Sequence, residues 1–274
     1  GCGIAVSGYA SLLACDAQSA AKKTSSVAFD NAVDVIEASD VIFFTVPDGE
    51  ISNAWNSLVD SYGAAAADVL FGKIVCHCSG ALPAAALTDA AEYGAHAASV
   101  HPLFAISGGG SAHAKIGSAL FTLEGDASAL ATVSTLLDAC EVRHRQIASC
   151  DKPLYHAAAV CASNLAVGLF ASAQTMLERC GFDADEARGA LRPLFVGNCE
   201  SIAERGPVDA LTGPIERNDS ETVMGHLLAF REDPTLLKER DAYTALSRVV
   251  VEIAAAKHPE RDYSQLAEIL RAAR

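Results

Sequence analysis

Two histidines are the strongest candidates for proton transfer in this sequence. His101 follows the apolar run from Ala97 to Val100 and precedes Pro102, and His156 lies in an alanine-rich stretch. Imidazole titrates near neutral pH, so it can donate a proton to a carbonyl or imine that receives a hydride. We therefore predict His101 or His156 as the proton donor of a reduction. The alternative for His101 is a histidine that only fixes its loop.

Polar residues follow His156 on the same predicted helix. Ser163 comes seven residues later, two helical turns away, and Asn164 lies within about 80° of that face. Buried polar groups need partners, because an unpaired one costs roughly 1–3 kcal/mol. We predict a catalytic Asn164 and a substrate-binding Ser163, with a helix across a dimer interface as the alternative partner.

Other short segments are candidates for contact with a cofactor or substrate. Val46-Pro47-Asp48 and Ser79-Gly80 each follow an apolar run and are predicted to bind the cofactor. The alternatives are an ordinary Pro-Asp-Gly turn and a helix N-cap at Ser79. Thr212-Gly213 is a candidate substrate contact or simply a helix-breaking loop. The glycine-rich segment Ser107 to Ser111 lacks a following Lys-Ser/Thr pair, so we expect a lid beside His101 rather than a phosphate loop.

Alternating strands and helices must position these residues. We expect strands at 4–9, 41–46, 73–77, 97–100, 118–124 and 142–147, and helices near 51–59, 82–91 and 127–139. The run Val41 to Val46 has no polar alternation, which is typical of a parallel strand covered on both faces. The pattern predicts a doubly wound α/β sheet with its ligand crevice at the carboxyl ends of the strands. Pro47, Ser79 and His101 fall at these ends.

The second half of the chain has only helical patterns. Helices are predicted at 151–180, 184–205, 220–230, 234–257 and 263–274. We therefore expect two domains, residues 1–149 and 150–274, the second an all-helical domain for substrate binding and dimerisation. The predicted reaction site is a cleft between the sheet edge that carries His101 and the helix that carries Asn164.

The first residues contain a partial glycine fingerprint. Gly1-Cys2-Gly3 supplies the G-x-G of the turn whose backbone approaches a dinucleotide pyrophosphate. Gly3 runs directly into the predicted strand at Ile4, without the strand and helix that should flank such a turn. Either residues are missing between Gly3 and Ile4, or the turn is degraded and cofactor binding is lost. Under the first explanation, Gly1 and Gly3 bind the cofactor.

Composition excludes several classes of protein. The 274 residues include 34 acidic and 20 basic side chains, a net charge of -14, which disfavours binding to nucleic acid or anionic lipid. With 51% hydrophobic and 20% charged residues, the chain is globular rather than disordered. The nine cysteines form no C-x-x-C pair, which predicts no metal site and favours a reducing cytoplasm. The apolar stretch Leu154 to Met176 contains four polar residues, too many for an unassisted membrane span.

Together the motifs resemble a known family. In chain order they are Val46-Pro47-Asp48, His77-Cys78-Ser79-Gly80-Ala81-Leu82, Ser99-Val100-His101-Pro102-Leu103-Phe104, Tyr155-His156 through Ser163-Asn164, and Leu211-Thr212-Gly213-Pro214-Ile215. Their order and spacing are similar to those of Rossmann-like oxidoreductases that carry a helical C-terminal domain of unknown function. That family is itself similar to pyrroline-5-carboxylate reductase, deazaflavin-dependent NADP reductase and, more distantly, prephenate dehydrogenase.

The resemblance implies a Rossmann-type domain, NADP binding and hydride transfer to a small carbonyl or imine. In prephenate dehydrogenases a similar His-Pro histidine binds substrate, which supports His101. Pyrroline-5-carboxylate reductases close their substrate site from the position of Thr212-Gly213. Val160 stands where hydroxyacid dehydrogenases have a catalytic lysine, which argues against that sister family.

The choice of cofactor depends on the end of the second expected strand. An acidic residue there would hold the ribose 2′-hydroxyl of NAD. The chain instead has Gly8-Tyr9-Ala10-Ser11, with Lys22 and Lys23 downstream, which favours NADP, with Ser11 as a contact. We expect a homodimer, because a long alanine-rich helix can bury extensive surface. The alternatives are a non-catalytic nucleotide-binding or sensing protein and a deazaflavin-dependent NADP reductase.

Overall fold

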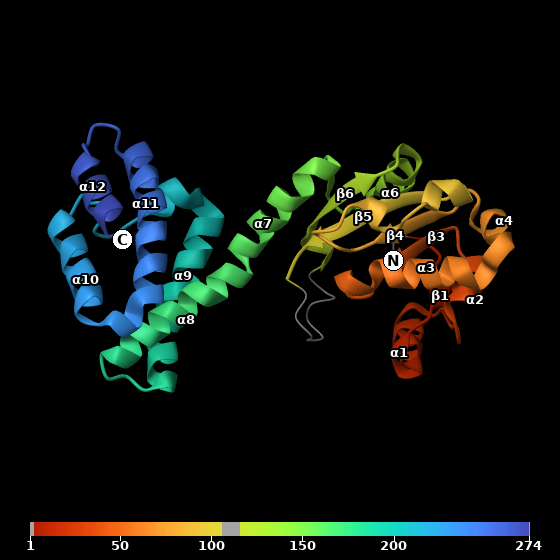
Figure 1. Cartoon of the computed structure of the whole chain (residues 1–274), viewed down its shortest axis with the longest axis horizontal. Coiled ribbons are helices and arrows are strands. Elements are labelled where there is room, and N and C mark those ends of the chain that lie inside the picture. Colours follow the sequence, from red (N-terminus) through yellow and green to blue (C-terminus); the bar gives the residue numbers. More distant parts are fainter. Residues whose placement is uncertain (1–2, 106–115, 274) are drawn as a thin grey trace. The chain divides into compact units, whose positions relative to one another are not determined.

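The computed structural model describes residues 3–105 and 116–273 (Figure 1). Gly1 and the predicted lid, Ser107 to Ser111, lie outside the described residues. The chain forms two compact units, Gly1–Val160 and Cys161–Arg274. The division between these units falls later than the expected domain boundary after residue 149, because the first turns of the helix Lys152–Ala162 (α7) belong to the first unit.

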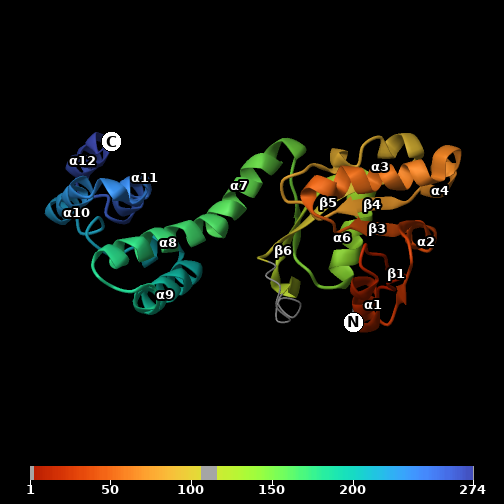
Figure 2. The same ribbon diagram turned by 60° about the horizontal axis from the view of Figure 1, so that its bottom comes forward.

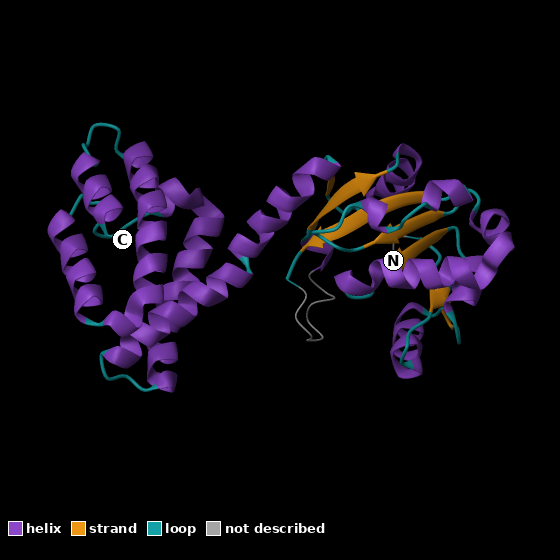
Figure 3. Cartoon of the chain, in the orientation of Figure 1, coloured by secondary structure: helices purple, strands orange, loops and turns teal. Residues whose placement is uncertain are grey.

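The first unit is built on a five-stranded sheet in the order β3-β4-β5-β6-β7. Figure 3 draws the strands in orange among the helices of this unit. The strands of this sheet are Val41–Phe44 (β3), Ile74–His77 (β4), His96–Leu103 (β5), Leu120–Gly125 (β6) and His144–Gln146 (β7). All neighbours are parallel except β5 and β6, which are antiparallel. The sheet is therefore mostly parallel, as the sequence predicts, and the carboxyl ends of β3, β4 and β5 lie at one edge.

Helices cover both faces of this sheet (Figure 2). Val75 of β4 packs with Trp55 of the helix Ile51–Tyr62 (α3), whereas Cys76 packs on the other face with Val133 of the helix Ala127–Ala139 (α6). Successive side chains of a strand point to opposite faces, so an uninterrupted apolar run fills both layers. The remaining helices of the unit are Ala14–Thr24 (α1), Ala32–Glu37 (α2) and Ala66–Leu70 (α4).

The N-terminal strands form a separate small sheet. Gly8–Tyr9 (β1) pairs in parallel only with Val27–Ala28 (β2), across α1. The strand expected at 4–9 is thus much shorter than predicted, because its partner β2 offers only two residues for pairing. Ser11 lies just beyond the carboxyl end of β1.

Two further predictions for the first unit are wrong in detail. Instead of a helix at 82–91 there are two 3₁₀ turns, Ala84–Ala86 and Ala90–Tyr93. The amide of Ala84 donates a hydrogen bond of 2.7 Å to the Glu124 carboxylate, which connects this segment to β6. The strand predicted to end at Val100 continues to Leu103, because β6 pairs with it along its whole second half. His101 therefore lies within β5, near its carboxyl end.

The second unit is helical throughout its described residues. It contains Asn164–Arg179 (α8), Ala184–Ala210 (α9), Ser220–Glu232 (α10), Leu237–Lys257 (α11) and Ser264–Ala272 (α12). Val223, Val251, Leu266 and Leu270 are the centre of its core. Gly206 interrupts α9 with φ 78° and ψ 166°, where the sequence predicts a helix end.

The long helix predicted at 151–180 is two helices. Ser163, with φ -122° and ψ -80°, separates α7 from α8.

By length and composition, residues 149–179 are apolar enough to cross a membrane. The same segment includes Lys152, which is only 2% exposed and hydrogen-bonded to the sheet of the first unit.

The cysteines do not all remain thiols. Cys140 is disulfide-bonded, a bond that the expected reducing cytoplasm does not favour. Seven other cysteines in the described part of the chain are free, of which Cys76 is buried in the sheet.

Candidate functional site

His101 is anchored at the carboxyl edge of the sheet by two neighbours. Its Nδ1 lies 2.7 Å from the hydroxyl of Tyr155 on α7, and the two rings meet edge to face. The Thr122 hydroxyl, on the residue opposite His101 in β6, donates to the same Tyr155 oxygen. With Nδ1 engaged, Nε2 is the nitrogen of His101 that is left for a ligand.

His156 lies beside His101, as a shared site requires. The two ring centroids are 6.5 Å apart, and Nδ1 of His156 is buried without a hydrogen-bond partner among the described residues. Gly80 packs against both rings. A Cβ on Gly80 would lie 2.8 Å from Nε2 of His101 and 2.9 Å from Nδ1 of His156. Both nitrogens thus converge on one backbone position, where only glycine fits without displacing a ring.

The turn that carries Gly80 is fixed by the Ser79 hydroxyl. This hydroxyl donates to the Asp48 carboxylate at 2.6 Å and accepts from the amides of Ala81 and Leu82. It therefore caps a turn, although no α-helix follows. Its bonding capacity is already used, so Ser79 would reach a cofactor through its backbone unless one of these bonds is given up.

Lys152 is a site residue that the sequence analysis missed. Its ammonium group donates to Oγ of Ser99 at 2.6 Å and to the Ser79 carbonyl at 3.2 Å, and the residue is 2% exposed. A lysine in a first helical turn is normally solvated, so the residue type alone does not predict that Lys152 is buried. The available signal was its spacing, three and four residues before Tyr155 and His156, which places all three on one helix face.

The electrostatics of the site favour a neutral His101. Burial, followed by the positive charge of Lys152 and the neighbouring His156, lowers the pKa of His101 to about 4. Burial also lowers the pKa of Lys152, opposed by the carboxylates of Glu124 and Asp48, and burial raises the pKa of Tyr155. At neutral pH the imidazole of His101 is therefore uncharged.

His77 has a structural place in the same edge. Its Nδ1 accepts from the amide of Ser79 at 3.2 Å, and its Nε2 donates to the Pro83 carbonyl at 2.9 Å. Burial lowers its pKa, which suits the neutral ring that this pattern requires.

The other predicted cofactor contacts are spread over the first unit. Val46, Pro47 and Asp48 follow β3 at the same edge and are exposed. Ser11 and Gly3 are exposed near the small N-terminal sheet.

Lys22 and Lys23, which favour NADP in the sequence, lie in the last turn of α1. Ser11 precedes the first turn of the same helix. The choice of NADP over NAD stays a prediction.

The remaining predicted site residues belong to the second unit. They are Ser163, Asn164, Thr212 and Gly213. The break at Ser163 removes the continuous helix from which a shared face with His156 was inferred. The Ser163 hydroxyl instead donates to Oδ1 of Asn164 at 2.9 Å. His101 and His156 lie together in the first unit, and the roles of Ser163, Asn164, Thr212 and Gly213 stay predictions.

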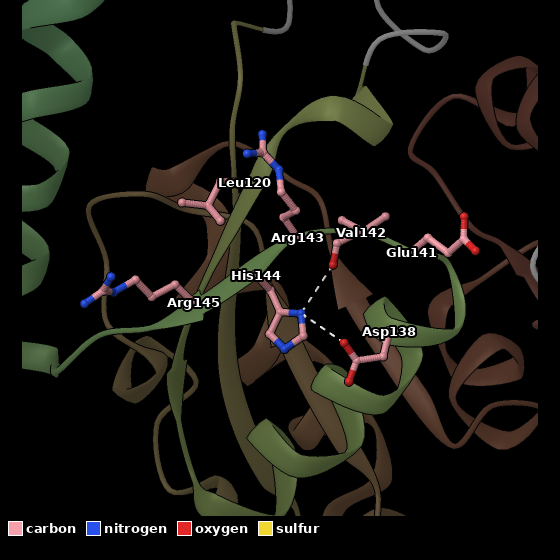
Figure 4. Close-up of a pocket in the computed structure, with 7 residues that line it drawn as sticks. All are labelled: Leu120, Asp138, Glu141, Val142, Arg143, His144 and Arg145. Atoms are coloured by element: carbon pink, nitrogen blue, oxygen red, sulfur yellow. Dashed lines mark hydrogen bonds and ion pairs between the residues drawn. The ribbon is translucent and has the colours of Figure 1, made fainter. Parts of the chain in front are cut away.

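A separate hollow of about 660 Å³ lies at the β7 side of the sheet (Figure 4). Arg143 and Arg145 extend from its rim, and His144 Nδ1 is 3.7 Å from the Asp138 carboxylate. It is open to solvent and holds none of the predicted site residues. Among the described residues, no three histidine, cysteine or acidic side chains gather as metal ligands anywhere in the chain.

Two domain models match the sequence of this chain. Residues 2–102 match the Rossmann-like domain model, and residues 119–250 match the model of a domain of unknown function, DUF2520. The comparison with curated proteins found no match.

Solved structures share the fold of almost the whole chain. Protein TM1727 of Thermotoga maritima is 26% identical, with a TM-score of 0.70 and 89% of each chain covered. Protein BF3122 of Bacteroides fragilis, provisionally described as an NADP oxidoreductase, is 19% identical, with a TM-score of 0.61 and coverage of 92% of this chain and 90% of that one.

More distant neighbours include reductases. An imine reductase of Myxococcus stipitatus solved with NADP⁺ is 16% identical, with a TM-score of 0.51 and coverage of 89% and 83%. Pyrroline-5-carboxylate reductases share the fold as well. The solved structures share the fold, and the two model matches agree with the resemblance of the motifs: the sequence matches a Rossmann-like domain followed by a DUF2520 domain.

Proposed function

We propose that this protein is an oxidoreductase that transfers a hydride between NADP(H) and a small carbonyl or imine substrate. In this proposal the substrate oxygen or nitrogen exchanges its proton with Nε2 of His101, and His156 binds the same group. The carrying observation is the convergence of these two histidines on Gly80 at the carboxyl edge of the sheet. This edge is where open α/β sheets bind their ligands.

The cofactor would lie along the turns after β3 and β4. Val46-Pro47-Asp48 and Ser79-Gly80 offer backbone groups there, and the nicotinamide would supply or accept the hydride. The neighbouring fold of a reductase solved with NADP⁺ supports a nicotinamide dinucleotide. The preference for NADP over NAD rests on the absence of an acidic residue after β1, from Ala10 to Leu13.

The protonation state of His101 bears on the direction of the reaction. A neutral His101 accepts a proton from an alcohol or amine as its carbon loses a hydride. Reduction requires the opposite transfer, from imidazolium to substrate. An anionic group bound nearby favours the charged imidazole and would raise its pKa toward neutrality. We therefore propose that reduction begins only after a negatively charged ligand is bound.

Calorimetry and absorbance test the proposal. We expect the full native chain to bind NADPH, and one member of a panel of small carbonyls and imines to oxidise it. His101→Asn should lower turnover at least about 100-fold, the usual size of a general acid–base contribution. The exposed His226 serves as the control, since His226→Asn should leave turnover unchanged. Absence of NADPH binding at millimolar concentration would contradict the proposal, whereas binding without turnover would favour a nucleotide-binding protein without catalysis.

We also propose that the protein forms a homodimer through the second unit. Apolar side chains are exposed along α8 and α9; they are Leu165, Val167, Leu169, Leu194, Val196 and Ile202. Exposed apolar side chains that gather on one surface mark protein contacts, and a second copy of this chain would bury them against the same side chains.

A further inference from the structure

Three groups form a closed set of hydrogen bonds behind the two histidines. The Lys152 ammonium donates to Ser99 and to the Ser79 carbonyl, and the Ser99 hydroxyl donates to that same carbonyl at 3.0 Å. Ser99 belongs to β5, Ser79 follows β4, and Lys152 begins α7. The set therefore joins, at one point, the three elements that carry His101, Gly80 and His156.

We propose that Lys152 is a positioning residue for the histidine pair: its ammonium ties the Ser79–Gly80 turn to β5 and so holds Gly80 between the rings of His101 and His156. Gly80 is tightly packed between the two rings, because a Cβ on Gly80 would lie within 3 Å of both. A turn that moved by that much would change the spacing of the two ring nitrogens. The lysine side chain does not contact the ligand in this role.

Burying this ammonium would be costly without compensation. Two hydrogen bonds engage two of its three N–H donors, and two carboxylates, Glu124 of β6 and Asp48 after β3, favour its positive charge. Glu124 is itself fixed by the Ser149 hydroxyl and the Ala84 amide. These hydrogen bonds and carboxylates stabilise the charged ammonium of Lys152, which an apolar side chain at this position would not need.

The charge of Lys152 also reaches His101. The groups that face His101 are Lys152, Tyr155 and His156 of α7, Thr122 of β6, and Asp48. Of these, Lys152 exerts the largest electrostatic influence and favours the neutral ring, while Asp48 opposes it. One side chain would thus set both the position and the protonation of the proposed proton-exchanging group.

Nuclear magnetic resonance of the full chain, labelled at histidine and glycine, tests this role without any substrate. The measurements are the His101 titration from about pH 8 to about pH 3, a range that includes its lowered pKa of about 4, and the Overhauser effect between the Gly80 Hα and His101 Hε1 protons. Lys152→Met should raise the His101 titration midpoint by about one pH unit and weaken the Overhauser effect severalfold. The control is Lys73→Met, which removes a lysine bonded to the Ser39 carbonyl at the opposite end of β4, and should change neither.

A second variant separates the charge from the hydrogen bond and guards against misfolding. Ser99→Ala keeps the ammonium but removes its 2.6 Å acceptor and the Ser99 hydrogen bond to the Ser79 carbonyl, so the Overhauser effect should weaken while the midpoint stays near the wild-type value. Wild-type values for both measurements in Lys152→Met would overturn the inference. If Lys152→Met does not fold, an unchanged Overhauser effect in Ser99→Ala would overturn it. The inference rests on the proposed function, in which His101 exchanges a proton with the substrate. Its test needs no NADPH, so failure of this inference can be distinguished from failure of the proposed function.

Discussion

His101 and Tyr155 meet through a 2.7 Å hydrogen bond between Nδ1 and the phenol, although 54 residues separate them in sequence. The bond connects the sheet to the first turn of α7 and orients the imidazole so that Nε2 is free of described partners. Thr122 completes the chain through the same phenol oxygen. This arrangement fixes a histidine by one nitrogen and leaves the other for chemistry, as acid–base sites require.

Removing the phenol hydroxyl should weaken this anchor. We expect Tyr155→Phe to lower the free energy of unfolding by about 1–2 kcal/mol, because it leaves His101 Nδ1 and Thr122 without their shared partner. Urea unfolding measures the change, and a double-mutant cycle with Thr122→Val should show coupling of about 1 kcal/mol. Tyr62→Phe, which removes a hydroxyl bonded to the Val33 carbonyl, is the matched control for one lost bond. Additive effects of the two changes at Tyr155 and Thr122 would argue against a shared network.

Gly80→Ala tests the packing of the two rings. The new methyl group would lie under 3 Å from both histidines, so one ring or the turn must move. We expect a destabilisation of about 1–3 kcal/mol and a large loss of any NADPH-dependent turnover. Gly49→Ala, in the neighbouring turn with open space around it, should change neither. Equal melting temperatures for the two variants would show that the rings are less closely packed than described.

The pH dependence of stability follows from the neutral His101. Its pKa is about 4 when folded against an ordinary value of 6.5, so between these values the unfolded chain binds a proton that the folded chain does not. Stability should therefore be full above about pH 6.5 and decline as pH falls toward 4, by about 2 kcal/mol after allowing for solvent screening. Urea unfolding across this range should show a smaller decline for His101→Asn.

Two comparisons sharpen that pH experiment. His77, whose pKa burial also lowers, should leave a residual decline in His101→Asn. His226→Asn, at an exposed position, should retain the wild-type slope. A wild-type slope in His101→Asn would place the titration elsewhere.

The homodimer proposal predicts an effect confined to the helical unit. Val167 of α8 is 71% exposed, and Val167→Glu should convert a dimer into monomers in analytical ultracentrifugation, since a carboxylate in an apolar interface is unpaired. Leu12→Glu, at a still more exposed apolar residue near the small N-terminal sheet, should remain dimeric. A wild-type chain that sediments as a monomer at all concentrations would contradict the proposal.

Much of the fold was predictable because its signals are local. The uninterrupted apolar run at 41–46 identified β3, and the helix expected at 127–139 matches α6. Boundaries failed where a distant partner decides them. Pairing with β6 carries β5 past Val100, and the side chain of Glu124 captures Ala84 where a helix was expected.

The site shows the same division. His101 and His156 were found from residue type and position, and the structure brings them together. Lys152 and Tyr155 were missed because their roles depend on contacts that cross from α7 to strands more than 30 residues away. Ser163 and Asn164 were assigned to His156's helix face from an unbroken helix, and a single non-helical residue removed that basis.

The central claim is that a nicotinamide dinucleotide binds at the edge where His101 and His156 meet Gly80. The most direct measurement is a titration of the full native chain with NADPH in which the magnetic resonance signals of these three residues are recorded at each step. The account predicts saturable shifts of all three, and smaller or absent shifts for His226. Signals of His101, His156 and Gly80 that stay unchanged up to millimolar NADPH, or shifts confined to other residues, would contradict it.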